Sequence, residues 1–167
     1  LQSAGLVYEK EGNFLDRFRN RIIIPIKDQN SNTIAFGARR ILDGNSPKYI
    51  NSPESPIYNK SSVLFALNRA KEAIRESDSV IFMEGYFDVI SAHLGGVENA
   101  VATCGTALTP QHIKLISRYS PNRRIYLAFD TDKAGKQAIE HGAEVIKSIF
   151  NSLGDVKQYD SNFRSYN

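Results

Sequence analysis

The stretch that decides the fold is Val80-Ile-Phe-Met-Glu-Gly-Tyr-Phe-Asp-Val-Ile90. Its first four residues are apolar and too few for a helix, so they predict a short buried strand. Gly85 permits the tight turn that leads from a strand into a helix, and the apolar spacing becomes helical from Tyr86 onward. Glu84 is therefore expected at the carboxyl end of this strand, and Asp88 in the first turn of the helix.

A second strand ends in the same way. Residues 124–130 read Arg-Ile-Tyr-Leu-Ala-Phe-Asp, and residues 131–135, Thr-Asp-Lys-Ala-Gly, begin the next helix. In an open α/β sheet, ligands bind at the carboxyl ends of the strands, so two such strands can bring their acids to one point. Because like charges placed together repel one another, the pattern calls for a divalent cation. The four carboxylates concerned belong to Glu84, Asp88, Asp130 and Asp132.

Between and after these strands the pattern alternates strand and helix. Strands are predicted at residues 80–84, 99–104 and 124–130, and helices at residues 86–94, 109–119 and 134–153. Thr109-Pro110 supports the middle helix, because Thr is a good N-terminal cap and Pro fits the first helical position. Such alternation predicts a parallel sheet with right-handed crossovers. Gly105-Thr106, after the middle strand, could offer backbone N–H groups to a phosphate, although a turn alone also explains the glycine.

The first half has a different character. Residues 21–28 and 33–39 are two strand-like runs joined by Gln-Asn-Ser-Asn, which predicts an antiparallel hairpin. Pro25 places the first of these strands at an edge or at a bulge. The three prolines of residues 47–56 favour an ordered loop or a short extended piece. Ser62 is a plausible cap for a helix over residues 63–74.

Charge is unevenly distributed between these halves. Residues 17–60 hold eight Lys and Arg against three Asp and Glu, whereas residues 61–167 hold twelve of each. The first half could therefore bind a polyanion, while the second half carries the acids. A basic surface that only contacts water would have the same composition. Arg17, Arg19 and Arg21 would share one face if that segment were extended.

Composition excludes other classes of protein. The chain has 167 residues, of which 41% are hydrophobic, and no apolar run approaches the length of a membrane span. One cysteine, Cys104, rules out an internal disulfide, and we expect it to be a buried apolar side chain. The three histidines have no metal-ligand spacing.

The block Glu84-Gly-Tyr-Phe-Asp88, followed by Asp130-Thr-Asp-Lys-Ala-Gly135, resembles the toprim (topoisomerase–primase) signature. Upstream, Arg17-Phe-Arg-Asn-Arg21 and Pro47-Lys-Tyr-Ile-Asn-Ser-Pro-Glu54 resemble bacterial-type DNA primases. The resemblance covers nearly the whole chain. It implies an α/β fold: a Rossmann-like parallel toprim sheet flanked by helices, preceded by a smaller mixed α/β subdomain with an antiparallel hairpin. The expected boundaries are 1–77 for the smaller subdomain, 78–153 for toprim and 154–167 for a tail or insertion loop.

The resemblance also implies a function. Primases are DNA-directed RNA polymerases that join ribonucleoside triphosphates into short primers on single-stranded DNA, with Mg²⁺ or Mn²⁺ as cofactor. Asp88, Asp130 and Asp132 would hold the metal, and Glu84 would be a further ligand or the general base. Lys133 could contact a phosphate, although a solvated position fits it equally well. The cleft for template and nucleotide would be lined by Arg19, Arg21, Lys48, Asn51 and Lys60.

Several expectations concern what lies outside this pattern. No Asp-Pro-Asp motif of the kind primases carry follows residue 150, and the chain starts without Met, so we expect a weakly active or inactive fragment. Zinc-binding and helicase-binding domains, the latter contacting the replicative helicase, would belong to the full protein at bacterial replication forks in the cytoplasm. The alternatives are another toprim enzyme, a nucleic-acid-binding module without activity, or a haloacid dehalogenase-type phosphatase. Ala134 argues against the phosphatase, which needs Thr or Val there.

Overall fold

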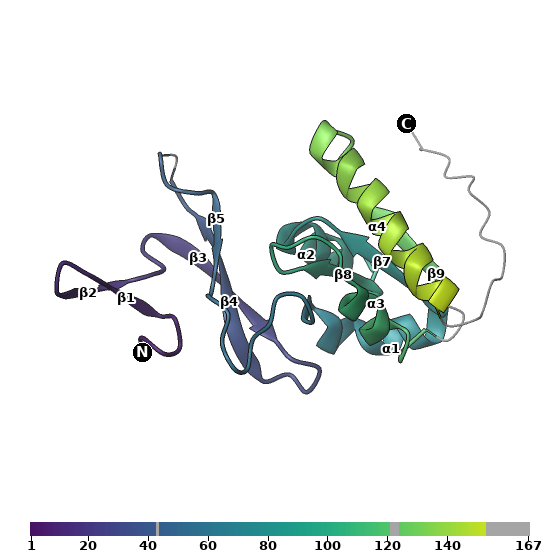
Figure 1. Ribbon diagram of the computed structural model, residues 1–167, viewed down its shortest axis with the longest axis horizontal. Helices are drawn as coiled ribbons and strands as arrows, with labels where there is room; N and C mark the ends of the chain where they lie inside the picture. Colours follow the sequence, from purple (N-terminus) through teal and green to yellow (C-terminus); the bar gives the residue numbers. More distant parts are fainter. Residues whose placement is uncertain (43, 121–123, 153–167) are drawn as a thin grey trace.

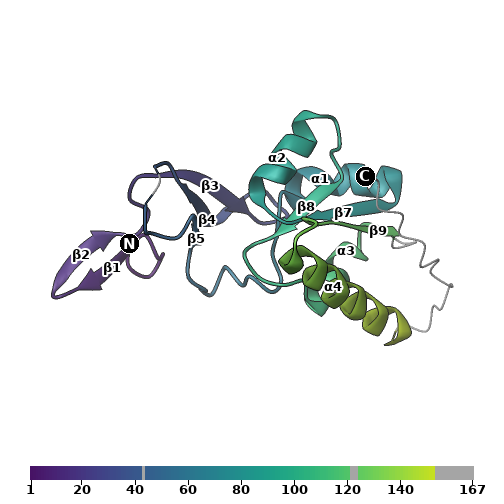
Figure 2. The ribbon, with the colours of Figure 1, turned by 90° about the horizontal axis from the view of Figure 1, so that it is seen from above.

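The computed structural model describes residues 1–42, 44–120 and 124–152, except for the side chains of residues 150–152. The described strands form three sheets, which follow one another along an elongated molecule. Figures 1 and 2 show a two-stranded hairpin at one end, a three-stranded sheet in the middle and an α/β body at the other end. The hairpin consists of β1 (Val7–Lys10) and β2 (Asn13–Asp16), which the sequence patterns did not predict.

The middle sheet has the strand order β3-β4-β5. The predicted hairpin is confirmed as β3 (Arg21–Lys27) and β4 (Thr33–Arg40), and the proline-rich segment contributes the short strand β5 (Tyr49–Asn51). The turn between β3 and β4 is stabilised by Asp28, whose Oδ1 accepts hydrogen bonds from the N–H groups of Asn30 and Asn32. Pro25 lies in β3, an edge strand, where its missing N–H costs no hydrogen bond within the sheet.

The α/β body contains a four-stranded sheet in the order β6-β8-β7-β9. Strands β7 (Ser79–Met83), β8 (Ala100–Thr103) and β9 (Arg124–Ala128) are parallel, and the two-residue β6 (Leu64–Phe65) pairs antiparallel with β8. Helices α2 (Tyr86–Leu94), α3 (Pro110–Ile116) and α4 (Lys133–Ser152) follow the three parallel strands in turn. The predicted α/β alternation is thus confirmed. In the part of the chain that the structure describes, no helix is both long and apolar enough to cross a membrane.

Alternate residues of β7 face two different cores. Val80 and Phe82 are fully buried among side chains of α3, α4 and the helix α1 (Leu67–Ser77). Ile81 and Met83 pack instead against a second cluster, which joins α2 to Ile24 and Ile26 of the middle sheet. Figure 2 shows α2 on one side of the sheet and α3 and α4 on the other. The second core therefore fixes the middle sheet against the α/β body, and the site described below lies along that junction.

One predicted element is wrong. Ser62 does not cap a helix, because Leu64 and Phe65 form the buried strand β6 and α1 begins only at Leu67, after Ala66 in a left-handed conformation. A contact with the N-terminus of α3 explains why no helix begins at Ser62. Thr109 Oγ1 donates to the Ser61 carbonyl at 2.6 Å, so this segment is held by a contact 48 residues away in sequence. Thr109 itself caps α3, as predicted, and the buried His112 completes the cap.

Candidate active site between the middle sheet and the α/β body

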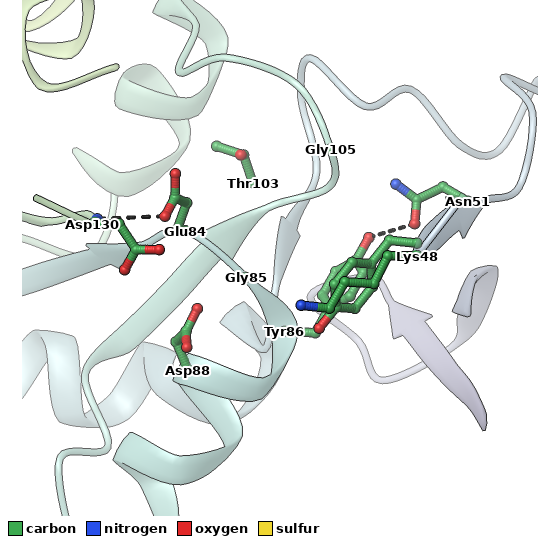
Figure 3. A pocket seen from close by; sticks show the side chains of 10 residues that line it. Lys48, Asn51, Glu84, Gly85, Tyr86, Asp88, Thr103, Gly105 and Asp130 are labelled. Atoms are coloured by element: carbon green, nitrogen blue, oxygen red, sulfur yellow. Dashed lines mark hydrogen bonds between the residues drawn. The ribbon is translucent and has the colours of Figure 1, made fainter. Parts of the chain in front are cut away.

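A cavity of about 400 Å³ lies between β5 and the carboxyl ends of β7, β8 and β9. Figure 3 shows the acidic side chains on one side of it and Lys48 and Asn51 on the other. This is the edge of a parallel sheet, where ligand sites are expected. The cavity is lined by Lys48, Tyr49, Asn51, Glu84, Gly85, Tyr86, Asp88, Thr103, Gly105 and Asp130.

The acids reach the cavity because β7 and β9 are neighbours in register. Met83 pairs with Ala128, so the two strands end side by side; Glu84 follows β7 directly, and Asp130 comes two residues after the end of β9. The Asp130 N–H donates to Glu84 Oε2 at 3.4 Å. Asp88 adds a third carboxylate from the first turn of α2. Sequence reasoning thus placed Glu84, Asp88 and Asp130 together, and the structure does bring them to one cavity.

The fourth predicted acid, Asp132, lies next to the cavity and does not line it. Its Oδ1 accepts a hydrogen bond from the Gly135 N–H at 2.8 Å, at the start of α4. A Cβ at Gly135 would approach the Asp130 carbonyl oxygen to 2.0 Å, so only glycine lets α4 begin this close to the acid. In the described segments, no three Asp, Glu, His or Cys side chains form a compact metal-binding group.

The pKa of Glu84 is raised above its ordinary value. The largest cause is a partial loss of water contact, and the negative charges of Asp130 and Asp132 act in the same direction, against the hydrogen bond from the Asp130 N–H. None of the described Lys or Arg side chains makes an ion pair with these acids. A set of carboxylates that repel one another and lack a basic partner fits a divalent cation, whose usual ligands are oxygens.

The opposite wall of the cavity is held by arginines that contact main chain. Arg21 Nη1 donates to the carbonyls of Pro47 and Lys48 at 2.9 and 3.4 Å, and Arg17 donates to the Asn51 carbonyl at 3.1 and 3.2 Å. Arg19 is exposed. Arg17, Arg19 and Arg21 would share one face only in an extended segment, and that condition is not met, because residues 17–20 bend and turn.

Other predicted residues lie outside the cavity lining. The main chain of Lys60 is engaged by Glu54 and His112, Thr106 accepts a hydrogen bond from the Thr103 hydroxyl, and Lys133 is exposed at the start of α4. Gly105 does line the cavity. Burial raises the pKa of the Cys104 thiol to about 11, consistent with the expected apolar role.

Tyr86 and Thr103 line the cavity although sequence reasoning gave neither a role there. The position of Thr103 could have been predicted, because it ends β8, the second of the three parallel strands along the chain. Ligands bind at the carboxyl ends of such strands. For Tyr86 the helical apolar pattern indicated only a core position. Its hydroxyl donates to Asn51 Oδ1 at 2.9 Å, a contact between residues 35 apart in sequence.

Comparisons with known proteins agree with this architecture. Residues 1–71 match the family described as DNA primase catalytic core, N-terminal domain, and residues 81–161 match the family described as Toprim-like. A DNA primase from Synechococcus elongatus is 43% identical over 151 residues, which are 89% of this chain and 22% of that protein. The chain therefore spans less than a quarter of the length of this relative.

Solved structures give the same result. The zinc-binding and RNA polymerase domains of the Aquifex aeolicus primase superpose with a TM-score of 0.81 at 38% identity, over 89% of this chain and 36% of that one. The structure of the DnaG primase catalytic domain bound to ssDNA superposes with a TM-score of 0.77 at 35% identity, over 86% and 44% of the two chains. From its two family matches and these relatives, the chain belongs to the DnaG-type DNA primases, as part of the catalytic core with its toprim domain.

Proposed function

We propose that the protein containing this chain synthesises short RNA primers on single-stranded DNA by metal-dependent nucleotidyl transfer. In this reaction a 3′-hydroxyl attacks the α-phosphate of a ribonucleoside triphosphate and pyrophosphate leaves. The observation that carries the proposal is the two-sided cavity, in which Glu84, Asp88 and Asp130 face Lys48. A triphosphate with a divalent cation needs both signs of charge around it, and this cavity supplies them.

Glu84, Asp88, Asp130 and Asp132 are the residues that would hold Mg²⁺ or Mn²⁺. When bound there, the cation would neutralise phosphate charge and lower the pKa of the attacking hydroxyl. Glu84 is also a candidate general base, because its raised pKa lies closer to neutrality than that of an ordinary carboxylate. As a ligand it would instead lose its proton to the cation's field, and the two roles are distinguished by the pH dependence of the rate.

The side of the cavity that carries Lys48 and Tyr49, here called the basic wall, would bind the phosphates and the template. Lys48 lines the cavity directly, with its Nζ 5.9 Å from the centre of the Tyr49 ring, so one phosphate contact and one aromatic surface lie together. Aromatic rings of this kind stack on bases in single-stranded nucleic acid. A related catalytic domain with the same fold is described as bound to ssDNA. We therefore assign template and nucleotide binding to residues 1–77, and metal and proton chemistry to residues 78–153.

The remaining expectations belong to the full protein. A zinc-binding domain, contact with the replicative helicase and action at the replication fork in the bacterial cytoplasm would involve segments other than those described here. The test of the proposed function uses the full-length protein on a single-stranded template. Incorporation of labelled ribonucleotides into short products should depend on Mg²⁺ or Mn²⁺, and it should be lost when Glu84 or Asp130 is neutralised. Products that form without a template would contradict the proposal.

A further inference from the structure

A hydrogen bond links Asn51 of β5 to Tyr86, the first residue of α2. Asn51 Oδ1 accepts a hydrogen bond from the Tyr86 hydroxyl at 2.9 Å, and Asn51 Nδ2 donates to the Cys104 carbonyl at 2.9 Å. One carboxamide thus joins the middle sheet to the start of α2, the contact drawn in Figure 3, and also to the residue that follows β8. Both of its polar atoms are occupied by protein groups before any ligand arrives.

The surroundings of this link leave it little freedom. A Cβ at Gly37 would lie 2.5 Å from Tyr86 Cε2, and a Cβ at Gly105 would lie 2.5 Å from Asn51 Nδ2. On another side, the Phe65 ring meets the Tyr86 ring edge-on, with centroids 4.8 Å apart. Tyr86 is 5% exposed, so its ring is enclosed. Two positions without side chains therefore make room for the pair, and neighbouring groups hold it there.

The link has direct consequences for the two walls. Glu84 precedes Tyr86 by two residues and Asp88 follows it by two, so the position of Tyr86 fixes both carboxylates. Lys48 precedes Asn51 by three residues and lies immediately before β5. A shift of Asn51 relative to Tyr86 would therefore change the distance from the Lys48 ammonium group to the carboxylates of Glu84 and Asp88. A bound triphosphate would span this distance.

We propose that Asn51 and Tyr86 are positioning residues, whose hydrogen bond sets the separation between the basic and acidic walls of the cavity. This deepens the proposed function and rests on it for one of its readouts. It also revises the role of Asn51, which the resemblance to primases implied was a direct nucleotide contact. Gly37 and Gly105 are part of the same arrangement, because any side chain at either position would displace Tyr86 or Asn51.

The test is a double-mutant cycle with Tyr86→Phe, Asn51→Ala and the double variant in the full-length protein. The readouts are the KM for ribonucleoside triphosphate and the affinity for a fluorescent nucleotide analogue in Mn²⁺. Each single variant should raise KM about 5- to 10-fold, the range expected for one lost hydrogen bond, with a smaller change in kcat. The double variant should be no worse than the worse single variant, since both changes break one interaction. Multiplied effects would instead mean that Asn51 contacts the nucleotide itself and would overturn the proposal.

Tyr119→Phe is the matched control. The Tyr119 hydroxyl donates to Gln29 Oε1 at 2.8 Å, so it also ties the middle sheet to the α/β body, but Tyr119 does not line the cavity. Nucleotide KM should be unchanged in this variant. An equal loss there would show that any loosening of the junction has the same effect, and the positioning role would be refuted.

A readout that needs no ligand separates this inference from the proposed function. Amide hydrogen exchange by mass spectrometry should be faster in residues 84–88 and 104–106 of Tyr86→Phe and Asn51→Ala, by about 5- to 10-fold. Tyr119→Phe should affect residues 28–32 instead. If exchange follows this pattern while the wild type binds no nucleotide, the proposed function fails and the positioning link stands. Unchanged exchange in residues 84–88 would refute the link whatever the activity.

Discussion

The main-chain N–H of Asp130 points at the Glu84 carboxylate, with the nitrogen 3.4 Å from Oε2, although the two residues are 46 positions apart. The contact exists because β7 and β9 are parallel neighbours that end at the same level. It keeps two carboxylates at one place, where the charge of Asp130 helps to raise the pKa of Glu84. The acids are therefore arranged for a task other than packing.

The first prediction concerns these two acids. In the full-length protein, Glu84→Gln or Asp130→Asn should lower primer synthesis by at least about 100-fold, the low end for acid–base or electrostatic groups. Affinity for single-stranded DNA should change little, because the basic wall is untouched. Glu140→Gln, an exposed acid on α4, is the control and should retain activity. Near-normal synthesis by either cavity variant would refute the assignment.

The second prediction uses the raised pKa of Glu84. A raised folded-state pKa means that the folded protein holds this proton more tightly than the unfolded chain. The stabilisation is therefore complete below the ordinary carboxylate pKa of 4.5 and is lost as pH rises through the folded value. At neutral pH and without metal, Glu84→Gln should raise Tm, by no more than about 3 °C because the group is largely exposed. A Tm difference that is the same at pH 4 and pH 7 would show that charge is not the cause.

The third prediction concerns metal affinity. Three carboxylates line an open cavity, so water must fill much of the coordination sphere, and Mn²⁺ should bind with a Kd on the order of 0.1–1 mM. Titration calorimetry or the relaxation of water protons would measure this. Asp130→Asn should weaken it further, whereas Glu140→Gln should not. Micromolar affinity of these 167 residues alone would show that the described carboxylates already form a complete site.

The sequence predicted those features whose signal is local. The apolar run before Glu84 and the Thr109-Pro110 cap lie next to the elements they start or end, so β7, α2 and α3 were placed within a few residues of their observed bounds. What failed depends on partners far away in sequence. The segment after Ser61 looks like a helix entry until the contact from Thr109 is known. Likewise, the link from Tyr86 to Asn51 leaves no trace in periodicity.

The arginines show the same limit for the site. Alternating basic residues indicated a surface for a polyanion, but two of the three guanidinium groups bind the main chain of residues 47–51. The number of basic residues in a segment does not show which of them are free to bind phosphate. Here Arg17 and Arg21 instead hold the main chain of the loop that carries Lys48.

The fourth prediction follows from that division. Fluorescence anisotropy with labelled single-stranded DNA across a salt series should show a log–log slope that flattens by about 0.7 in Lys48→Ala and in Arg19→Ala, because each would lose one phosphate contact. Arg21→Ala should weaken binding through the loop it supports, with little change in slope. The effects should be equal on unrelated template sequences, since phosphate contacts carry no base information. Wild-type slopes in both Lys48→Ala and Arg19→Ala would place the template elsewhere.

The last prediction concerns the buried His112. Its Nδ1 lies 3.2 Å from the Thr109 nitrogen and its Nε2 lies 2.9 Å from the Lys60 carbonyl oxygen. An N–H can only donate and a carbonyl can only accept, so the ring is neutral with its proton on Nε2. A second proton would go to Nδ1, where it would meet the Thr109 N–H and break the cap of α3. Burial accordingly lowers the pKa of His112 from its ordinary 6.5.

A lowered histidine pKa makes the folded state bind fewer protons than the unfolded chain at mildly acid pH. Stability is therefore kept above about pH 6.5 and lost as pH falls from there toward the folded pKa, by up to about 1.4 kcal/mol per pH unit. Urea unfolding between pH 7.5 and 5 would measure this slope. His112→Gln should be less stable at pH 7.5 but nearly flat over that range, whereas His141→Gln, at an exposed position on α4, should keep the wild-type slope. If His112→Gln retains the full slope, the acid sensitivity arises at another group, and the neutral tautomer is not what holds α3 against residues 60–61.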